Sequence, residues 1–309
     1  MRSLFVMDPV DSLNLAGDST YMLMKASTGR GWETSWCTPN DLYMVSGVTH
    51  VRAQPIATRT GVFDRGDWTE EPLSNFRIVW MRKDPPFDMH YIFTTYLLEQ
   101  TAASTLVLNH PAGLRSRNEK LFAAGFADLT PPTLVSRDIA RIAAFVREQP
   151  DRAVLKPWDG NGGRGVLVTH GRDANLRSMI ELLTGDGREF IIAQRHAPEI
   201  SQGDKRIILV DGEPAGAILR VPSAADHRGN MHAGATVSST TLSPRDREIC
   251  ARIGPILRAE GLVFVGIDVI GPWLTEINVT SPTGIQEINR LDGVQLEERL
   301  LDAAVRRIA

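Results

Sequence analysis

Two apolar segments with the pattern of β-strands carry acidic side chains, and this restricts how the chain can fold more than any other feature. Residues 263–271 read VFVGIDVIG, with Asp268 in their interior, and residues 274–279 read LTEINV. Side chains alternate between the two faces of a strand, so Glu276 and Asn278 point the same way. A hairpin this apolar needs something that compensates the charge of its acids.

The register of this hairpin decides whether the two acids meet. A three-residue loop, GPW, would pair Ile270 with Leu274 and place Asp268 directly opposite Glu276, with Cβ atoms about 5 Å apart. Two carboxylates that close require either protonation of one of them or a cation between them. Oxygen ligands favour a hard ion, so Asp268, Glu276 and Asn278 are the predicted Mg²⁺ ligands. The alternative is that one acid pairs with a structural arginine or lies at a solvated edge.

A glycine-rich segment, GNGGRG at residues 160–165, lies between two strand-like segments, AVLKP and VLVTH. A dinucleotide-binding loop leads into a helix and a P-loop ends in G-K-[ST], and this segment does neither. A strand–loop–strand flap can lay backbone N–H groups over phosphates, because glycine lets the backbone approach closely. Lys156 before the flap and Lys120 at a predicted helix start would add positive charge for a triphosphate. The alternative is a flexible hairpin turn.

Polar and basic residues at strand ends are candidates for holding anions. Arg82 ends one predicted strand, Asp204 and Arg206 begin another, and Arg228 and Asn230 lie in a polar segment. The planar fork of an arginine suits a substrate carboxylate. A surface arginine without a ligand is the ordinary alternative for each of them.

The order of the predicted elements gives an N-terminal α/β domain that ends near residue 115. In the first domain, alternating strands and helices predict a parallel sheet. Residues 48–75 look polar and irregular, with a hairpin. We expect a helix that starts at Ser116, since Ser116 and Glu119 have capping-box spacing.

The C-terminal part of the chain contains KRIILVDGEPAGAILRV, which predicts a hairpin with its turn at Asp211 and Gly212. The acidic hairpin follows it further along the chain.

Composition excludes several classes of function. The 309 residues carry a net charge of −3, so no general positive field favours nucleic acid or an acidic membrane. The two cysteines, Cys37 and Cys250, fit no zinc or disulfide spacing. Because no apolar run approaches the roughly 20 residues of a spanning helix, and the start reads as a strand, we expect a cytoplasmic protein.

Motifs along nearly the whole chain resemble those of the ATP-grasp ligases, and within them the bacterial glutathione synthetases. The most distinctive are MRKDPPFD and LTEINVTSPT, accompanied by VMDP, NEKLF, DLTPPTLV, LKPWDGNGG, GDKRIILVDGEP, RGN and GLVFVGIDVIG. The resemblance implies an α/β fold of the ATP-grasp type. Its parts are a Rossmann-like N-terminal domain at 1–115, a small lid domain with the glycine loop at 116–193 and a C-terminal antiparallel-sheet domain at 194–309, with ATP between the last two.

The resemblance also implies a role for each candidate residue. The ATP site would be formed by Lys120, Lys156, Gly160, Gly162, Gly163, Gly165, Gln194, Arg195, His196, Ala197 and Asp204. The catalytic arginines would be Arg206 and Arg228, which would also line the substrate site with Arg82, Asn230, Ser281, Pro282 and Thr283. The metal would be Mg²⁺, which Mn²⁺ could replace, on Asp268, Glu276 and Asn278.

The implied reaction joins γ-glutamylcysteine to glycine. ATP would phosphorylate the donor carboxylate and the amine of glycine would displace phosphate, with a closed flap excluding water. The family resemblance further implies a homo-oligomer, dimeric or tetrameric, whose partners are small molecules and neither nucleic acid nor membranes.

One segment departs from the family pattern. After RGN the family commonly continues through a glycine-rich stretch that holds an arginine, and Thr236 stands at that position here. The departure leaves open a ligase of the same mechanism with another acceptor amine or peptide donor. A non-catalytic ATP-binding protein is a further alternative, which the retention of all three predicted metal ligands disfavours.

Overall fold

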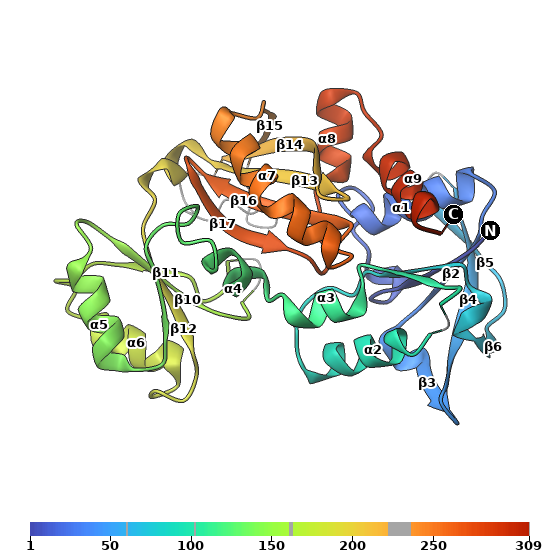
Figure 1. Cartoon of the computed structure of the whole chain (residues 1–309), viewed down its shortest axis with the longest axis horizontal. Coiled ribbons are helices and arrows are strands. Elements are labelled where there is room, and N and C mark those ends of the chain that lie inside the picture. Colours follow the sequence, from blue (N-terminus) through green and yellow to red (C-terminus); the bar gives the residue numbers. More distant parts are fainter. Residues whose placement is uncertain (60, 102, 161–162, 222–235, 309) are drawn as a thin grey trace.

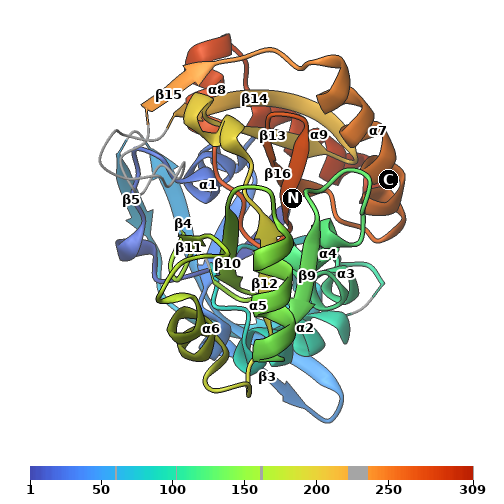
Figure 2. The same cartoon turned by 90° about the vertical axis from the view of Figure 1, so that its left-hand side faces the viewer.

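The computed structural model describes residues 1–59, 61–101, 103–160, 163–221 and 236–308. The strands that it describes form three sheets, and the mixed α/β architecture predicted from the sequence is confirmed (Figure 1). Viewed from the side, the small second sheet lies below the third, and α5 covers it toward the viewer (Figure 2).

The first sheet belongs to the N-terminal part of the chain and has the order β3-β4-β2-β1-β7-β8, with β5 and β6 also paired to β4. Its strands are β1 (Arg2–Val6), β2 (Glu33–Cys37), β3 (Leu42–Val45), β4 (Val48–Arg59), β5 (Val62–Arg65), β6 (Thr69–Pro72), β7 (Ile78–Met81) and β8 (Leu106–Leu108). The helices here are α1 (Ser19–Gly29), α2 (Met89–Glu99) and α3 (Pro111–Ser116). β2, β1, β7 and β8 run parallel, so the carboxyl ends of these strands open toward one edge.

The expectation of irregular structure at residues 48–75 is wrong over most of that range. β4 alone spans twelve residues and pairs antiparallel with β2, β3, β5 and β6. Buried Val51 and Ala53 alternate with more exposed neighbours, which is the period of a half-buried strand. The polar residues between them face solvent, and they make the segment look irregular in the sequence.

The second sheet is small, antiparallel and ordered β11-β10-β12-β9. It consists of β9 (Thr133–Ser136), β10 (Ala153–Pro157), β11 (Leu167–Thr169) and β12 (Ile191–Arg195). Helices α5 (Ile139–Glu148) and α6 (Leu176–Thr184) close a separate apolar core on one face. The opposite face is left for the site described below.

The third sheet has the order β15-β14-β13-β16-β17, and every pairing in it is antiparallel. Its strands are β13 (Asp204–Val210), β14 (Glu213–Val221), β15 (Thr236–Ser239), β16 (Phe264–Ile270) and β17 (Trp273–Asn278), with helices α7 (Pro244–Ala259), α8 (Ile285–Asp292) and α9 (Leu296–Ile308). The predicted turn at Asp211 and Gly212 is confirmed, with φ of 54° and 77°. Two successive positive φ angles are typical of the tight turns that join antiparallel strands.

The predicted helix start at Ser116 is wrong. Ser116 ends α3, and the next helix, α4 (Glu119–Ala124), starts after Asn118, whose side chain accepts the N–H groups of Lys120 and Leu121. Asparagine is a strong cap in its own right, so the side chain of Glu119 is free for the contact described below.

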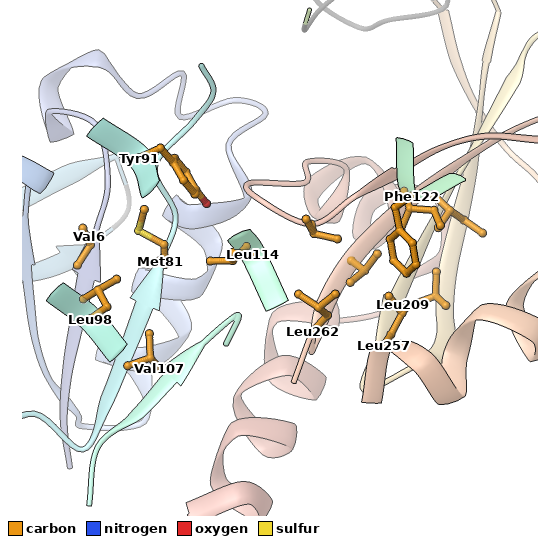
Figure 3. Packing of buried hydrophobic residues seen from close by; sticks show 14 of the residues in the cluster. Val6, Met81, Tyr91, Leu98, Val107, Leu114, Phe122, Leu209, Leu257 and Leu262 are labelled. Atoms are coloured by element: carbon orange, nitrogen blue, oxygen red, sulfur yellow. The ribbon is translucent and has the colours of Figure 1, made fainter. Parts of the chain in front are cut away.

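A buried asparagine joins the first sheet to the third. The side chain of Asn109, just beyond β8, accepts the N–H groups of Val263 and Phe264 and donates to the carbonyls of Phe264 and Val279, at 2.7–2.9 Å. The apolar cluster continues across this junction, and Leu114 lies between side chains of the two regions (Figure 3). The two regions are therefore joined by both polar and apolar contacts.

Candidate active site

A cavity of about 950 Å³ gathers almost all of the predicted site residues. Its walls come from β10, β12 and the glycine loop on one side and from β13, β14, β16 and β17 on the other, with α4 and the segments after β7 and β17 at one end. The predicted residues that line it are Lys120, Lys156, Gly160, Gly163, Gly165, Gln194, Arg195, His196, Ala197, Asp204, Arg206, Asp268, Glu276, Asn278, Ser281, Pro282 and Thr283.

Some predicted residues are not part of this lining. Gly162, Arg228 and Asn230 lie outside the residues that the structure describes. Arg82 is 4% exposed and lies behind the wall, with its guanidinium 4.7 Å from the centre of the Phe264 ring. It donates to the hydroxyl of Thr20 and to the carbonyl of Pro282, so it supports a residue that does line the cavity.

The acidic hairpin forms with the predicted facing of its acids, but by a different loop. Ile270 pairs with Trp273, so the turn has two residues and not the three expected. A bulge between the Val269–Leu274 and Asp268–Glu276 pairs then shifts the register by one, so Asp268 lies opposite Glu276. The tight turn requires φ of 55° at Gly271, which glycine tolerates.

Arginines surround the carboxylate of Asp268. Arg206 donates to both of its oxygens, at 2.6 and 3.1 Å, and Arg220 lies 2.9 Å from Oδ1. The amide of Asn278 donates to Oδ2 at 3.3 Å. Burial alone would raise the pKa of Asp268, but the two guanidinium groups more than offset this and hold the pKa well below its usual range. The alternative of a carboxylate paired with arginine therefore describes Asp268 as it stands in this structure.

Arg220 is a residue that the sequence did not single out. Its guanidinium bridges Asp204, with two contacts of 2.7 Å, and Asp268. The side chain is 4% exposed and lines the cavity. It completes a charged row of Asp204, Arg220, Asp268 and Arg206 across β13, β14 and β16.

The two predicted phosphate lysines enter the cavity from different elements. Lys120, on α4, lies 3.4 Å from Glu276 and donates to the carbonyl of Gly160 in the glycine loop. Lys156, on β10, donates to the side chain of Gln194 at 3.2 Å. Burial lowers the pKa of Lys156, against the opposing effect of Glu276. A buried ammonium with few partners gains most from an incoming anion.

The segment that links the second sheet to the third forms another part of the wall. Gln194 on β12 is held in place by Lys156 and by Thr133, to which it donates at 2.8 Å. The guanidinium of Arg195 lies 5.1 Å from the centre of the Trp273 ring. Residues 194–197 border the cavity together with the apolar Ile200, a setting that suits a flat base.

Glu119 is the second functional candidate that the sequence did not reveal. Its carboxylate accepts three hydrogen bonds, from the N–H of Val279 at 3.0 Å, the N–H of Thr280 at 3.1 Å and the hydroxyl of Thr280 at 2.8 Å. Burial raises the pKa of Glu119, and the hydrogen bonds from Thr280 oppose that rise. The contact fastens α4, which carries Lys120, to the chain that leaves the strand with Glu276 and Asn278.

The donor set on this wall fits a hard divalent cation. Asp268, Glu276 and Asn278 share one wall of the cavity and offer oxygen ligands alone. Among the residues with described positions, no cluster of three or more His, Cys, Asp and Glu suggests a different kind of metal site. Two carboxylates and an amide leave room for phosphate oxygens, as is usual for Mg²⁺.

This fold and this site are those of the ATP-grasp class, and solved structures share the fold. D-cycloserine synthetase DcsG superposes with a TM-score of 0.69 at 16% identity, covering 99% of this chain and 100% of that chain. The macrocyclase MdnC, bound with precursor peptide MdnA from Microcystis aeruginosa MRC, gives 0.68 at 15% identity with the same coverages. At these identities the likeness shows the fold alone.

Sequence relatives narrow the class to a family. The prokaryotic glutathione synthetase N-terminal domain matches residues 1–115, and the ATP-grasp domain of the same family matches residues 119–293. Glutathione synthetase of Brucella melitensis is 45% identical over 304 residues, 97% of each chain. That of Synechocystis is 44% identical over 314 residues, 97% of this chain and 98% of the relative. The chain belongs to the prokaryotic glutathione synthetase family.

Proposed function

We propose that this chain uses ATP to join γ-glutamylcysteine to glycine through an acyl phosphate, giving glutathione, ADP and phosphate. The observation that carries the proposal is one cavity whose lining includes two lysines, four arginines and the Asp268–Glu276–Asn278 set. Such a site can bind a triphosphate and a carboxylate together, and it offers no activated nucleophile of its own among the described lining residues.

Lys120 and Lys156 would bind the phosphates of ATP from opposite sides, with Gly160, Gly163 and Gly165 of the loop above them. Arg206 would hold the carboxylate of the donor beside the γ-phosphate. Mg²⁺ bound to Asp268, Glu276 and Asn278, or Mn²⁺ in its place, would offset the charge of the phosphates. Positioning and charge compensation are the main demands of phosphoryl transfer, and these residues supply both.

The arginines on Asp268 have a consequence for this proposal. A carboxylate offers about four acceptor positions, and the contacts from Arg206, Arg220 and Asn278 engage all four. Asp268 would therefore exchange at least one of these four contacts for the metal when substrates bind. Where the exchanged contact is one from an arginine, the released guanidinium would be available to the substrate carboxylate or phosphate.

The identity of the acceptor amine is where this chain departs from the family pattern. Thr236, at the family's arginine position, is an exposed residue that begins the edge strand β15. A ligase of the same mechanism with another acceptor amine is therefore the second candidate.

The test is the release of ADP in the presence of γ-glutamylcysteine and a panel of amines. We expect glycine to give the highest kcat/KM. If glycine were no better than other amines, the glutathione assignment would fail while the ligase class would stand.

We also propose a homo-oligomer, dimeric or tetrameric, on the basis of an apolar row on the outer face of α2. Met89, Phe93 and Tyr96 are 59%, 61% and 47% exposed. Light scattering of the purified protein would check this, and a Phe93→Glu variant should dissociate if α2 lies at the interface.

The two cysteines are free and buried, which suits the reducing cytoplasm that we propose as its location. In the described part of the chain no helix is long and apolar enough to cross a membrane.

A further inference from the structure

The end of the cavity beyond the predicted metal ligands contains an exposed carboxylate, that of Asp84. Asp84, in the segment after β7, lines the cavity beside Ser281, Pro282 and Thr283. Its side chain accepts the hydroxyl of Ser281. Among the described residues it forms no ion pair, whereas Asp204, Asp268 and Glu276 in the same lining each contact a lysine or an arginine.

The backbone of Asp84 is fixed from behind. Its N–H donates to the carboxylate of Asp8, at the end of β1, at 3.0 Å. Lys83 pairs with that same carboxylate at 2.9 Å and donates to the carbonyl of Asp84 at 2.7 Å. Asp8 and Lys83 therefore compensate each other's charge, and the Asp84 carboxylate is left facing the cavity.

The facing segment is also fixed by contacts that leave its hydroxyl available. Glu119 binds Thr280, Arg82 binds the carbonyl of Pro282 at 3.0 Å, and Arg206 binds the carbonyl of Thr283 at 3.1 Å. Ser281 lies between these anchored residues and directs its hydroxyl to Asp84. The buried guanidinium of Arg82 feels the charge of Asp84, but its N–H groups bond Thr20 and Pro282.

The charges of the substrates indicate what this carboxylate is for. The phosphates and the donor carboxylate are anions, and the cations of the cavity suit them. The acceptor amine enters as an ammonium, and an ammonium cannot attack an acyl phosphate until it loses a proton. Ser281 follows the strand with the predicted metal ligands by only a few residues, and its hydrogen bond to Asp84 places that carboxylate near the position where an acyl phosphate would be held.

We propose that Asp84, with Ser281, forms the subsite for the ammonium group of the acceptor and that Asp84 takes its proton. The inference rests on the proposed ligase function. One proton passes from the ammonium to the Asp84 carboxylate, and the freed lone pair forms the C–N bond. The bond between the acyl carbon and the oxygen that bridges to phosphorus breaks, and its electrons leave with phosphate. The phosphate then takes the second proton from the nitrogen. No oxidant, reductant or further reactant is needed.

Asp84→Asn tests the inference with two acceptors, the amine that the wild type prefers and hydroxylamine. Hydroxylamine is uncharged in mildly alkaline buffer, so it needs no carboxylate to bind or deprotonate it. We expect kcat/KM for the amino acid to fall by about 100-fold or more, the lower end of general-base contributions. The KM for the donor and the rate of hydroxamate formation should change little.

The pH profile and two further variants separate a proton acceptor from a structural residue. In Asp84→Asn the remaining ligation rate should rise with pH toward the pKa of the free amine, since only the neutral amine then reacts. Ser281→Ala should raise the KM for the acceptor more than it lowers kcat. Asp64→Asn, which changes an exposed carboxylate on β5, is the matched control and should behave as the wild type.

The failures of the two proposals are distinguishable. A wild type that consumes no ATP with any donor and amine would contradict the proposed function and the inference with it. A wild type that ligates normally, beside an Asp84→Asn variant with unchanged acceptor kinetics, would contradict the inference alone. The inference would also be wrong if that variant lost hydroxamate formation or raised the KM for the donor, because Asp84 would then serve the donor.

Discussion

Single residues in this site are understood from the charges around them. Asp268 is ionised because two guanidinium groups outweigh its burial, whereas Lys156 is buried with few compensating partners, which lowers its pKa. An anionic substrate that carries its own metal would relieve both situations. It would give Lys156 a counter-ion and Asp268 a different cation.

Glu276→Gln should abolish catalysis while leaving the fold intact. An amide is a weaker ligand for a hard ion than a carboxylate, so we expect kcat to fall by at least about 100-fold, as for the loss of one electrostatic contact in the transition state. The pair of Glu276 with Lys120 is partly exposed, so the free energy of unfolding should change by no more than about 1 kcal/mol. Steady-state kinetics and thermal unfolding measure the two effects, with Glu189→Gln as a surface control. Normal turnover in Glu276→Gln would refute the metal assignment.

Lys156 should make nucleotide binding depend on pH. Its lowered pKa means that the free protein loses this charge at a lower pH than an ordinary lysine would. Because phosphates favour the charged form, nucleotide binding should take up a proton as pH rises through that lowered pKa, and affinity should decline. Calorimetry in buffers of different ionisation enthalpy measures the proton uptake. Lys156→Arg keeps its charge and should show none; equal uptake in both proteins would exclude Lys156 as its source.

At the scale of elements, strand registers explain which parts of the site the sequence could predict. Parity along β17 predicts that Glu276 and Asn278 share a face, and the structure agrees. Asp268 meets Glu276 because a two-residue turn and a bulge together give the same register as the expected three-residue loop. No sequence signal marks that bulge.

The same physics hides Arg220. Counting back from the turn of the β13–β14 hairpin would pair Asp204 with Leu219 and turn Arg220 to the other face. A bulge between Ile208 and Leu209 shifts the register, so Asp204 pairs with Arg220. Glu119 was hidden for another reason, since its partners lie about 160 positions further along the chain. Capping-box spacing suggested a local role for it instead.

Glu119→Ala should loosen the junction between α4 and the end of β17. The substitution leaves the N–H groups of Val279 and Thr280 without an acceptor, and each buried unsatisfied group costs about 1–3 kcal/mol. We expect the free energy of unfolding to fall by about 2–6 kcal/mol on that basis, and the KM for ATP to rise because Lys120 is on the same helix. Urea denaturation and kinetics measure both. Glu119→Gln keeps an acceptor oxygen, so its effects on stability and KM should be much smaller. Equal effects in both variants would show that the charge of Glu119 matters more than its hydrogen bonds to Val279 and Thr280.

At the scale of the whole molecule, the cavity depends on how three sheets are held together. The second sheet has its own small core, whereas the first and third share an apolar cluster and the four hydrogen bonds of Asn109. This arrangement favours motion of the second sheet, with the glycine loop, against a stable remainder. Closure of that kind is how ligases of this chemistry would keep water from an acyl phosphate.

Asn109→Ala should destabilise the joined first and third sheets. It leaves two buried N–H groups and two carbonyls without their partner, so we expect the free energy of unfolding to fall by at least about 3 kcal/mol. Asn75→Ala, at an exposed position, is the control and should lie within about 0.5 kcal/mol of the wild type. Urea denaturation followed by tryptophan fluorescence compares them. A loss no larger than that of the control would mean that Asn109 does not hold the two sheets together.

Labelling with oxygen-18 can show whether the donor carboxylate is activated as an acyl phosphate. The C-terminal carboxylate of γ-glutamylcysteine is labelled, the protein turns over with ATP, Mg²⁺ and glycine, and the released phosphate is analysed by mass spectrometry. We expect one labelled oxygen in each phosphate formed, together with glutathione and ADP in equal amounts. Phosphate without the label, released alongside product, would rule out an acyl phosphate.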